Sequence, residues 1–177
     1  MRHCLPHPAL VSLLRALVIS KVDYCSSVLA GSPAVLLNRL QSVLNAASRL
    51  VFSARKFDHT TSLLCMLHWL KVPERIKFRL CVLTHRCLHD MASCYLAETI
   101  HPVSSCASQH HLSSTATSEL IVPSTRRSTT GDRAFPVVAV RACNSLPPFV
   151  RDAPSQVAFR SELKTFLFRL SFPAHDN

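Results

Sequence analysis

The chain has 177 residues, which is about the length of one domain. Apolar residues make up 48% of it, enough to bury a core, and charged residues only 17%, below the usual quarter. Lys and Arg outnumber Asp and Glu by 20 to 10, and the excess is spread along the chain. A diffuse positive field favours a polyanion such as nucleic acid or an acidic membrane surface. No run of about 18 uncharged apolar residues exists, so we expect no membrane span.

The eight cysteines have no CxxC spacing, and several lie in apolar helical runs, where a free thiol acts as a small hydrophobe. We therefore predict a reducing compartment and no disulfide framework. Near the N-terminus, the apolar stretch 9–20 is interrupted by Arg15 and lacks a small-residue cleavage site. The chain is predicted to be intracellular, nuclear or cytoplasmic, and not secreted.

Hydrophobic periodicity predicts helices along most of the chain. The first covers about Ala9–Leu29 and is apolar nearly all round, which is typical of a helix buried on most sides. Gly31 would end it, with Ser32 as N-cap and Pro33 as first residue of the next helix, about 33–52. The core face of that second helix is predicted to contain Leu36, Leu37, Leu40, Val43, Leu44, Ala47, Leu50 and Val51, and its polar face Asn38, Gln41, Ser42, Asn45, Ser48 and Arg49.

Three further helices are predicted before residue 101. Asp58 or Thr60 caps one that runs to His68, Pro73 opens one that runs to Asp90, and a short one spans about 93–100. The helix from Pro73 has a predicted core row of Ile76, Leu80, Leu83, Cys87 and Leu88. Its other face carries a basic stripe of Arg75, Arg79 and Arg86.

The second half of the chain starts with a Ser/His-rich linker, 101–118, which has no Lys, Arg, Asp or Glu. One short strand at 120–123, a polar basic loop at 125–132, a helix at 134–144 and a last helix capped by Ser155 follow. The apolar row of the last helix is Phe159, Leu163, Phe166, Leu167 and Leu170. We predict an all-α fold: an irregular helical bundle in residues 1–100, then the linker, then a less ordered C-terminal part, 119–177, with at most one short strand.

Candidate chemistry is sparse. A metal-dependent polymerase needs two or three converging carboxylates, and the ten acidic residues here include no adjacent pair. Cys81, His85 and His89 share one helix face but lack the usual zinc spacing and an intervening Glu. We therefore expect no catalytic residue, no metal and no cofactor. The basic residues remain as a candidate phosphate-binding set, the alternative being a solvated helix face and a polar loop. They are Arg75, Lys77, Arg79, Arg126, Arg127 and Arg133.

Several segments in order, over about residues 10–170, resemble a known family. They are ALVISKVDYCSSVLAG from Ala16, LQSVLNAASRLV from Leu40, LHWLKVPERIKFRLCVLTHRCL from Leu67, GDRAFP from Gly131, NSLP from Asn144 and FRSELKTFLF from Phe159. Together they resemble the C-terminal thumb and post-palm region of reverse transcriptases from non-LTR (LINE-type) retrotransposons, jockey-like and chicken-repeat-like elements. The resemblance implies a mainly helical part that grips template RNA and primer DNA, with the catalytic palm upstream of Met1.

Some positions depart from the family pattern. Asp90 and Ser93 stand where Gly and Pro are usual, Cys143 where Trp is common, and Gln109-His110-His111 in a typically Arg-rich stretch. Such changes suggest a decayed, 5′-truncated copy, which purifying selection on this short frame would contradict. The expected partner is RNA or an RNA–DNA hybrid, bound weakly and without sequence preference. Apolar faces that would contact the palm in the whole enzyme would be exposed here and would favour self-association. An inert relic or a helical protein-interaction module is the alternative.

Overall fold

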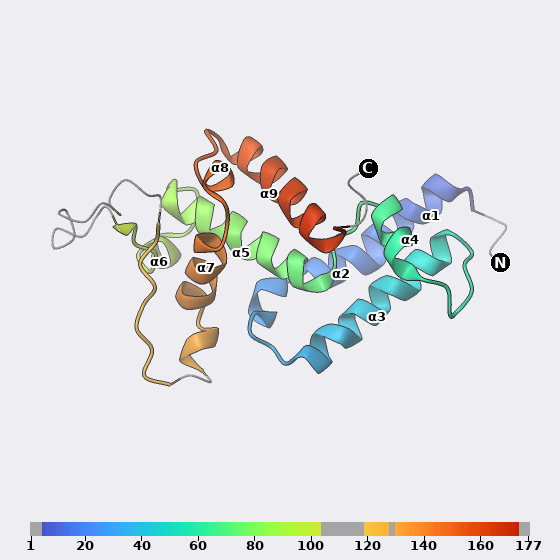
Figure 1. Cartoon of the computed structure of the whole chain (residues 1–177), viewed down its shortest axis with the longest axis horizontal. Helices are drawn as coiled ribbons and strands as arrows, with labels where there is room; N and C mark the ends of the chain where they lie inside the picture. The colour runs from blue at the N-terminus through green and yellow to red at the C-terminus, as the bar shows by residue number, and fades with distance from the viewer. Residues whose placement is uncertain (1–4, 104–118, 128–129, 174–177) are drawn as a thin grey trace. The chain divides into compact units, whose positions relative to one another are not determined.

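In a computed structural model, described for residues 5–103, 119–127 and 130–173, the chain is all-α, as predicted (Figure 1). No strand forms among these residues. The segment predicted as a strand makes only an isolated antiparallel bridge between Leu120 and Pro102. The packing divides into unit 1, residues 1–76 with 167–177, and unit 2, residues 77–166. The predicted boundary at 101–118 stays a prediction, because 104–118 lie outside the described residues.

The first helix of unit 1 ends earlier than predicted. It consists of α1 (His7–Leu14), a π turn η1 (Arg15–Ile19) and α2 (Ser20–Asp23). The Ser20 hydroxyl bonds to the Ala16 carbonyl, while the Ser20 N–H bonds to the Arg15 carbonyl five residues back. A Ser hydroxyl that bonds to the carbonyl four residues back competes with the backbone ladder of the helix and often bends it. The helix stops at Tyr24 and Cys25, where φ is 50°, and Ser26–Leu29 forms the separate 3₁₀ helix η2.

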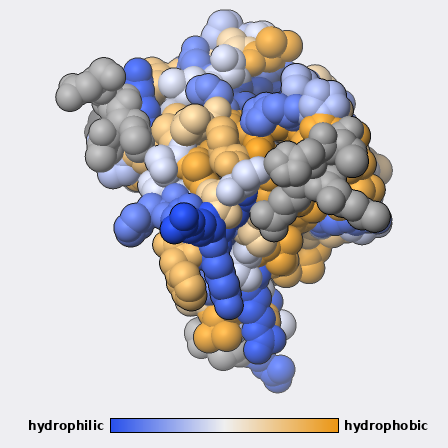
Figure 2. All heavy atoms as spheres, turned by 90° about the vertical axis from the view of Figure 1, so that its right-hand side faces the viewer, coloured by the Kyte–Doolittle hydropathy of each residue, from blue (hydrophilic) through white to orange (hydrophobic). Residues whose placement is uncertain are grey.

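The prediction that this first helix is buried on most sides is also wrong. Leu14 and Val22 are buried, whereas Leu13 and Leu17 are 43% and 60% exposed. Figure 2 views the molecule from the end where α1, α3 and α4 lie, and apolar surface is visible there between hydrophilic residues. The first helix therefore carries more apolar side chains than unit 1 buries.

Helix α3 (Ala34–Val51) confirms the clearest periodic prediction, with three corrections. Its N-cap is Pro33 and no side chain caps it, so Ser32 is not the cap. Ser48, assigned to the polar face, is fully buried, because its hydroxyl donates to the Asn45 carbonyl at 2.9 Å and needs no water. Leu36 and Val43, assigned to the core, are exposed.

The core of unit 1 is built where α3 meets α4 (Thr60–Met66) and the chain that follows. Its buried members are Leu14, Ala47, Val51, Leu64, Leu67, Trp69 and Phe172. Helix α4 begins after His59 without a side-chain cap, because the Asp58 carboxylate instead accepts the Arg55 N–H. Gln41 of α3 fixes the next helix, α5 (Val72–Leu88), by accepting the Val72 N–H at 2.9 Å. That N–H belongs to the first turn of α5 and has no partner within the helix.

Unit 2 contains the rest of α5, α6 (Cys94–Ala97), the 3₁₀ turn η6 (Gly131–Arg133), α7 (Phe135–Asn144), α8 (Pro148–Arg151) and most of α9 (Gln156–Ser171). Ser155 caps α9 as predicted, its hydroxyl accepting the Ala158 N–H at 3.2 Å. The Asn144 amide bonds to both backbone groups of Leu120, at 3.0 and 2.8 Å. Four residues of the predicted rows, Leu83, Leu88, Phe166 and Leu170, are not buried.

The different burial of neighbours on α4 leads to a stability prediction. Leu64 is 2% exposed and Met66 is 64% exposed. Leu64→Ala leaves a cavity and should lower the free energy of unfolding by about 2–5 kcal/mol, whereas Met66→Ala should change it by less than about 0.5 kcal/mol. Denaturant titration of both variants measures this, and equal effects would contradict the placement of α4.

Candidate nucleic-acid interface

The arginines predicted to bind phosphate lie in different surroundings. Arg75 belongs to unit 1 and is largely buried, with its side chain 12% exposed. Its Nη1 donates to both carboxylate oxygens of Asp23 at 2.8 and 3.0 Å, and its Nε to the Leu70 carbonyl at 2.9 Å. These contacts engage the guanidinium inside unit 1, so we leave Arg75 out of the proposed interface.

Arg86, assigned to the same basic stripe, also bonds to its own chain. Its Nε and Nη2 donate to the Met91 carbonyl at 3.1 and 2.8 Å, and the Met91 N–H bonds back to the Arg86 carbonyl at 2.9 Å. Asp90 has a φ of 54°, so the helix ends at Leu88 and not at Asp90. Of the other predicted residues on α5, Lys77 is partly exposed and Arg79 is exposed, both in unit 2.

The second predicted set lies around η6 in unit 2, where Arg126, Arg127 and Arg133 are all exposed. Asp132 holds this basic loop: its Oδ1 accepts the Thr125 hydroxyl at 2.9 Å and Arg141 Nη2 at 3.2 Å. The Gly131 N–H donates to the Arg127 carbonyl at 2.8 Å. A Cβ at Gly131 would lie 2.8 Å from the Thr125 Cβ, so only glycine permits this approach. Residues 128–129 of the predicted loop lie outside the described residues.

Arg126, Arg127 and Arg133 are therefore exposed beside the hydrogen bonds that Asp132 makes. Sequence reasoning omitted Arg141, which is exposed on α7 and pairs with the Asp132 carboxylate of the loop. Its position in the last turn of α7 was the available signal. Gln109-His110-His111, the departure from an Arg-rich stretch, lie outside the described residues.

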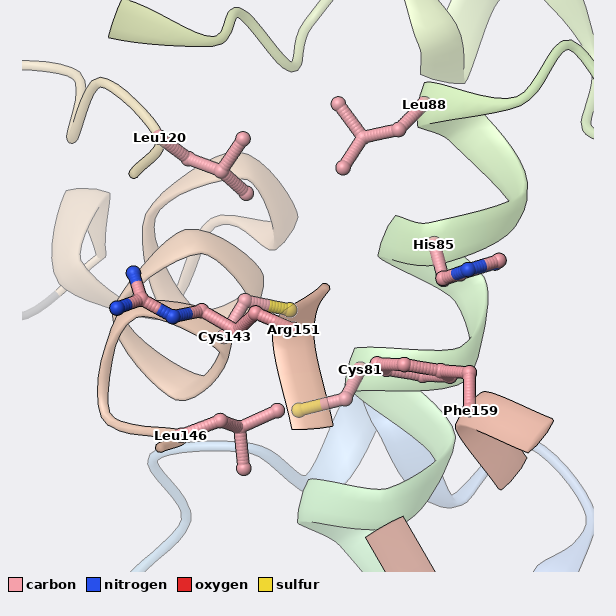
Figure 3. A pocket seen from close by; sticks show the side chains of 8 residues that line it. All are labelled: Cys81, His85, Leu88, Leu120, Cys143, Leu146, Arg151 and Phe159. Atoms are coloured by element: carbon pink, nitrogen blue, oxygen red, sulfur yellow. The ribbon is translucent and has the colours of Figure 1, made fainter. Parts of the chain in front are cut away.

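Unit 2 also contains a small cavity of about 60 Å³ between α5 and α7 (Figure 3). Its lining residues are Cys81, His85, Leu88, Leu120, Cys143, Leu146, Arg151 and Phe159. Figure 3 shows the sulfur atoms of Cys81 and Cys143 directed into the space between their helices. The hydrogen bond with Cys143, followed by burial, raises the pKa of the Cys81 thiol, which is therefore neutral. The volume is far below the roughly 300–1,000 Å³ of ligand pockets, so we do not assign a ligand to it.

The ring centroids of His85 and His89 lie 4.2 Å apart with the rings tilted by 37°, and the His85 ring stacks on Phe159 at 4.3 Å. Together with Cys81 they were the weak zinc pattern in the sequence. Within the described ranges, no three His, Cys, Asp or Glu side chains converge as metal ligands. No helix in the same ranges is long and apolar enough to cross a bilayer.

Comparisons with known proteins give no relative for this chain. No protein-family model, no curated protein and no solved structure matches it. Assignment of function therefore depends on the residues and the geometry above.

The cavity leads to a prediction about Cys143, which stands where the resembling family commonly has Trp. Cys143→Trp should place an indole in the cavity and raise the free energy of unfolding by about 0.5–2 kcal/mol. Val140→Trp is the control, because Val140 is fully buried on the same helix but does not line the cavity. Overpacking there should destabilise by about 1–3 kcal/mol. Denaturant titration compares the two, and a destabilised Cys143→Trp protein would contradict the fit.

His85 leads to a pH prediction. Burial, followed by the charge of His89, lowers the pKa of His85 from 6.5 to about 4, so folding favours its neutral form. Between these values the unfolded chain binds a proton that the folded chain does not. Stability from this group is therefore complete above pH 6.5 and is lost as the pH falls toward 4, by about 2–3 kcal/mol in total once solvent screening is allowed for.

Thermal unfolding between pH 7 and pH 4 measures this loss (roughly the span over which His85 titrates). His85→Leu should have a smaller dependence on pH than the unsubstituted chain. His101→Gln, at an exposed histidine, is the control and should keep the full dependence. An unchanged pH dependence in His85→Leu would show that His85 is not the group responsible.

Proposed function

We propose that the chain is a non-catalytic nucleic-acid-binding part of a retrotransposon-type reverse transcriptase, which binds RNA or an RNA–DNA hybrid without sequence preference. The observation that carries the proposal is that Arg126, Arg127 and Arg133 are exposed close to η6, where Asp132 accepts the Thr125 hydroxyl. Guanidinium groups bind phosphate with a planar fork, and such contacts carry affinity without sequence information. As part of such an enzyme the chain would act in the nucleus or cytoplasm.

Two further observations support the proposal. The net charge of +10 raises the local concentration of any polyanion around the chain. The all-α architecture is what the resemblance to a thumb region implies, and the cavity lies beside Cys143, where the resembling family commonly has the larger Trp. Among the described residues, Arg126 and Arg127 have exposed side chains on a turn that Asp132 stabilises.

The alternative, a helical protein-interaction module, is favoured by a different observation. Large apolar side chains stay exposed on the helices of unit 1, among them Leu17, Val28 and Val35 at 60%, 74% and 64%. Exposed apolar surface commonly marks protein contacts or self-association. Under this alternative the positive charge would have no specific use.

Salt dependence of binding tests the proposal. For each phosphate contact, the logarithm of the binding constant should fall with the logarithm of salt concentration by about 0.9 on a duplex and about 0.7 on a single strand. Arg126→Ala/Arg127→Ala should reduce this slope by about one to two and weaken binding equally across sequences. Fluorescence anisotropy with labelled RNA and RNA–DNA hybrid measures both quantities.

A charge-matched control is Arg15→Ala/Arg39→Ala, which removes two exposed arginines of unit 1. This control should bind nearly as well as the unsubstituted chain. Equal losses in both double variants would mean that only the diffuse charge acts. No binding at low salt, together with concentration-dependent association in sedimentation, would reject the proposal in favour of the protein-interaction module.

A further inference from the structure

The loop between α3 and α4 in unit 1 exposes an aromatic ring. Phe57 is 90% exposed, more than any other large apolar side chain in the described residues. Burying a phenylalanine side chain stabilises a fold by about 1.5–3 kcal/mol, and this ring contributes almost none of that. Its place in the sequence is therefore not explained by the core of unit 1.

The loop is hydrogen-bonded at both ends of the turn that contains Phe57. Arg49 of α3 donates from Nε and Nη2 to the Asp58 carbonyl at 3.3 and 3.1 Å. The Asp58 carboxylate accepts the Arg55 N–H at 2.6 Å, and the Asp58 N–H donates to the Arg55 carbonyl at 3.2 Å. Ser53 takes a φ of 52°, which turns the chain out of α3. The ring is thus presented from an ordered turn.

Two positively charged side chains lie on one side of this ring in the sequence. Arg55 and Lys56 precede it and are exposed, and the Lys56 ammonium lies 5.8 Å from the ring centroid. The carboxylate nearest in sequence, Asp58, accepts the Arg55 amide. An exposed aromatic face beside cations is what proteins use to bind single-stranded nucleic acid, since bases stack on the ring while phosphates contact the cations.

We propose that Phe57 is a stacking platform for an unpaired base of single-stranded RNA or DNA, with Arg55 and Lys56 on the adjacent phosphates. The inference rests on the proposed function and adds to it a preference for unpaired strand. A duplex covers the faces of its bases by stacking them on each other, so Phe57 contributes little to duplex binding. The contact is indifferent to sequence because every base has a π face.

Three substitutions at Phe57 separate stacking from general apolar contact. Phe57→Ala removes the ring, Phe57→Leu keeps an apolar side chain without a π face, and Phe57→Trp keeps and enlarges the face. Phe149→Ala is the matched control, because Phe149 is also exposed, at 63%, but belongs to α8 in unit 2. Since Phe57 is almost fully exposed, none of its variants should change the denaturant midpoint.

The experiment is anisotropy titration of the full chain with a short labelled poly-uridine strand and with an RNA duplex of equal length. Phe57→Ala and Phe57→Leu should each weaken single-strand binding about tenfold and leave duplex binding within about twofold, because one stacked base contributes about a tenfold factor. Phe57→Trp and Phe149→Ala should bind the single strand at least as well as the unsubstituted chain. The new Trp fluorescence should be quenched by the strand, above a background from Trp69, which is only 3% exposed.

Unchanged single-strand binding in Phe57→Ala overturns the inference while leaving the proposed function in place, provided that Arg126→Ala/Arg127→Ala still loses affinity. Wild-type affinity in Phe57→Leu overturns stacking in favour of an apolar contact. No binding of either probe by the unsubstituted chain at low salt rejects the proposed function and this inference together.

Discussion

The ion pair between Arg75 and Asp23 is a long-range contact that constrains unit 1. It joins the end of the first helix to the start of α5 across 52 residues of sequence, and both side chains are largely buried. Removing one partner of a buried pair leaves an uncompensated charge, which costs much more than the pair contributes. The pair also occupies Arg75, which the basic stripe in the sequence predicts to bind nucleic acid.

Other arginines likewise divide into those that bond to their own chain and those that are exposed. Arg49, Arg75 and Arg86 donate to backbone carbonyls of their own chain, at the ends of α3 and α5. Each satisfies a carbonyl that the helix or loop leaves open. Arg126 and Arg127 are instead exposed on a turn built by Asp132. Net charge alone therefore overstates the positive charge available to a polyanion.

The segments that carry the resemblance also build the fold. Asn144 bonds to both backbone groups of Leu120, Gly131 permits the approach of Thr125, and Trp69 lies in the core of unit 1. Cys143, where the family commonly has Trp, lines a cavity with Cys81. These residues have structural roles. The segments that carry the resemblance therefore explain how the chain packs more directly than where it binds a ligand.

The sequence by itself determined the helical class, the extent of α3 and α7 and the Ser155 cap of α9, because these depend on apolar spacing and capping within a few residues. It did not determine the end of the first helix, the burial of Ser48 or the outward position of Leu17 and Phe57. Only the tertiary structure decided those, and with them which cations are exposed. The physical reason is that a guanidinium or a ring takes its role from a partner such as Asp23, far away in sequence, whose approach no local periodicity records.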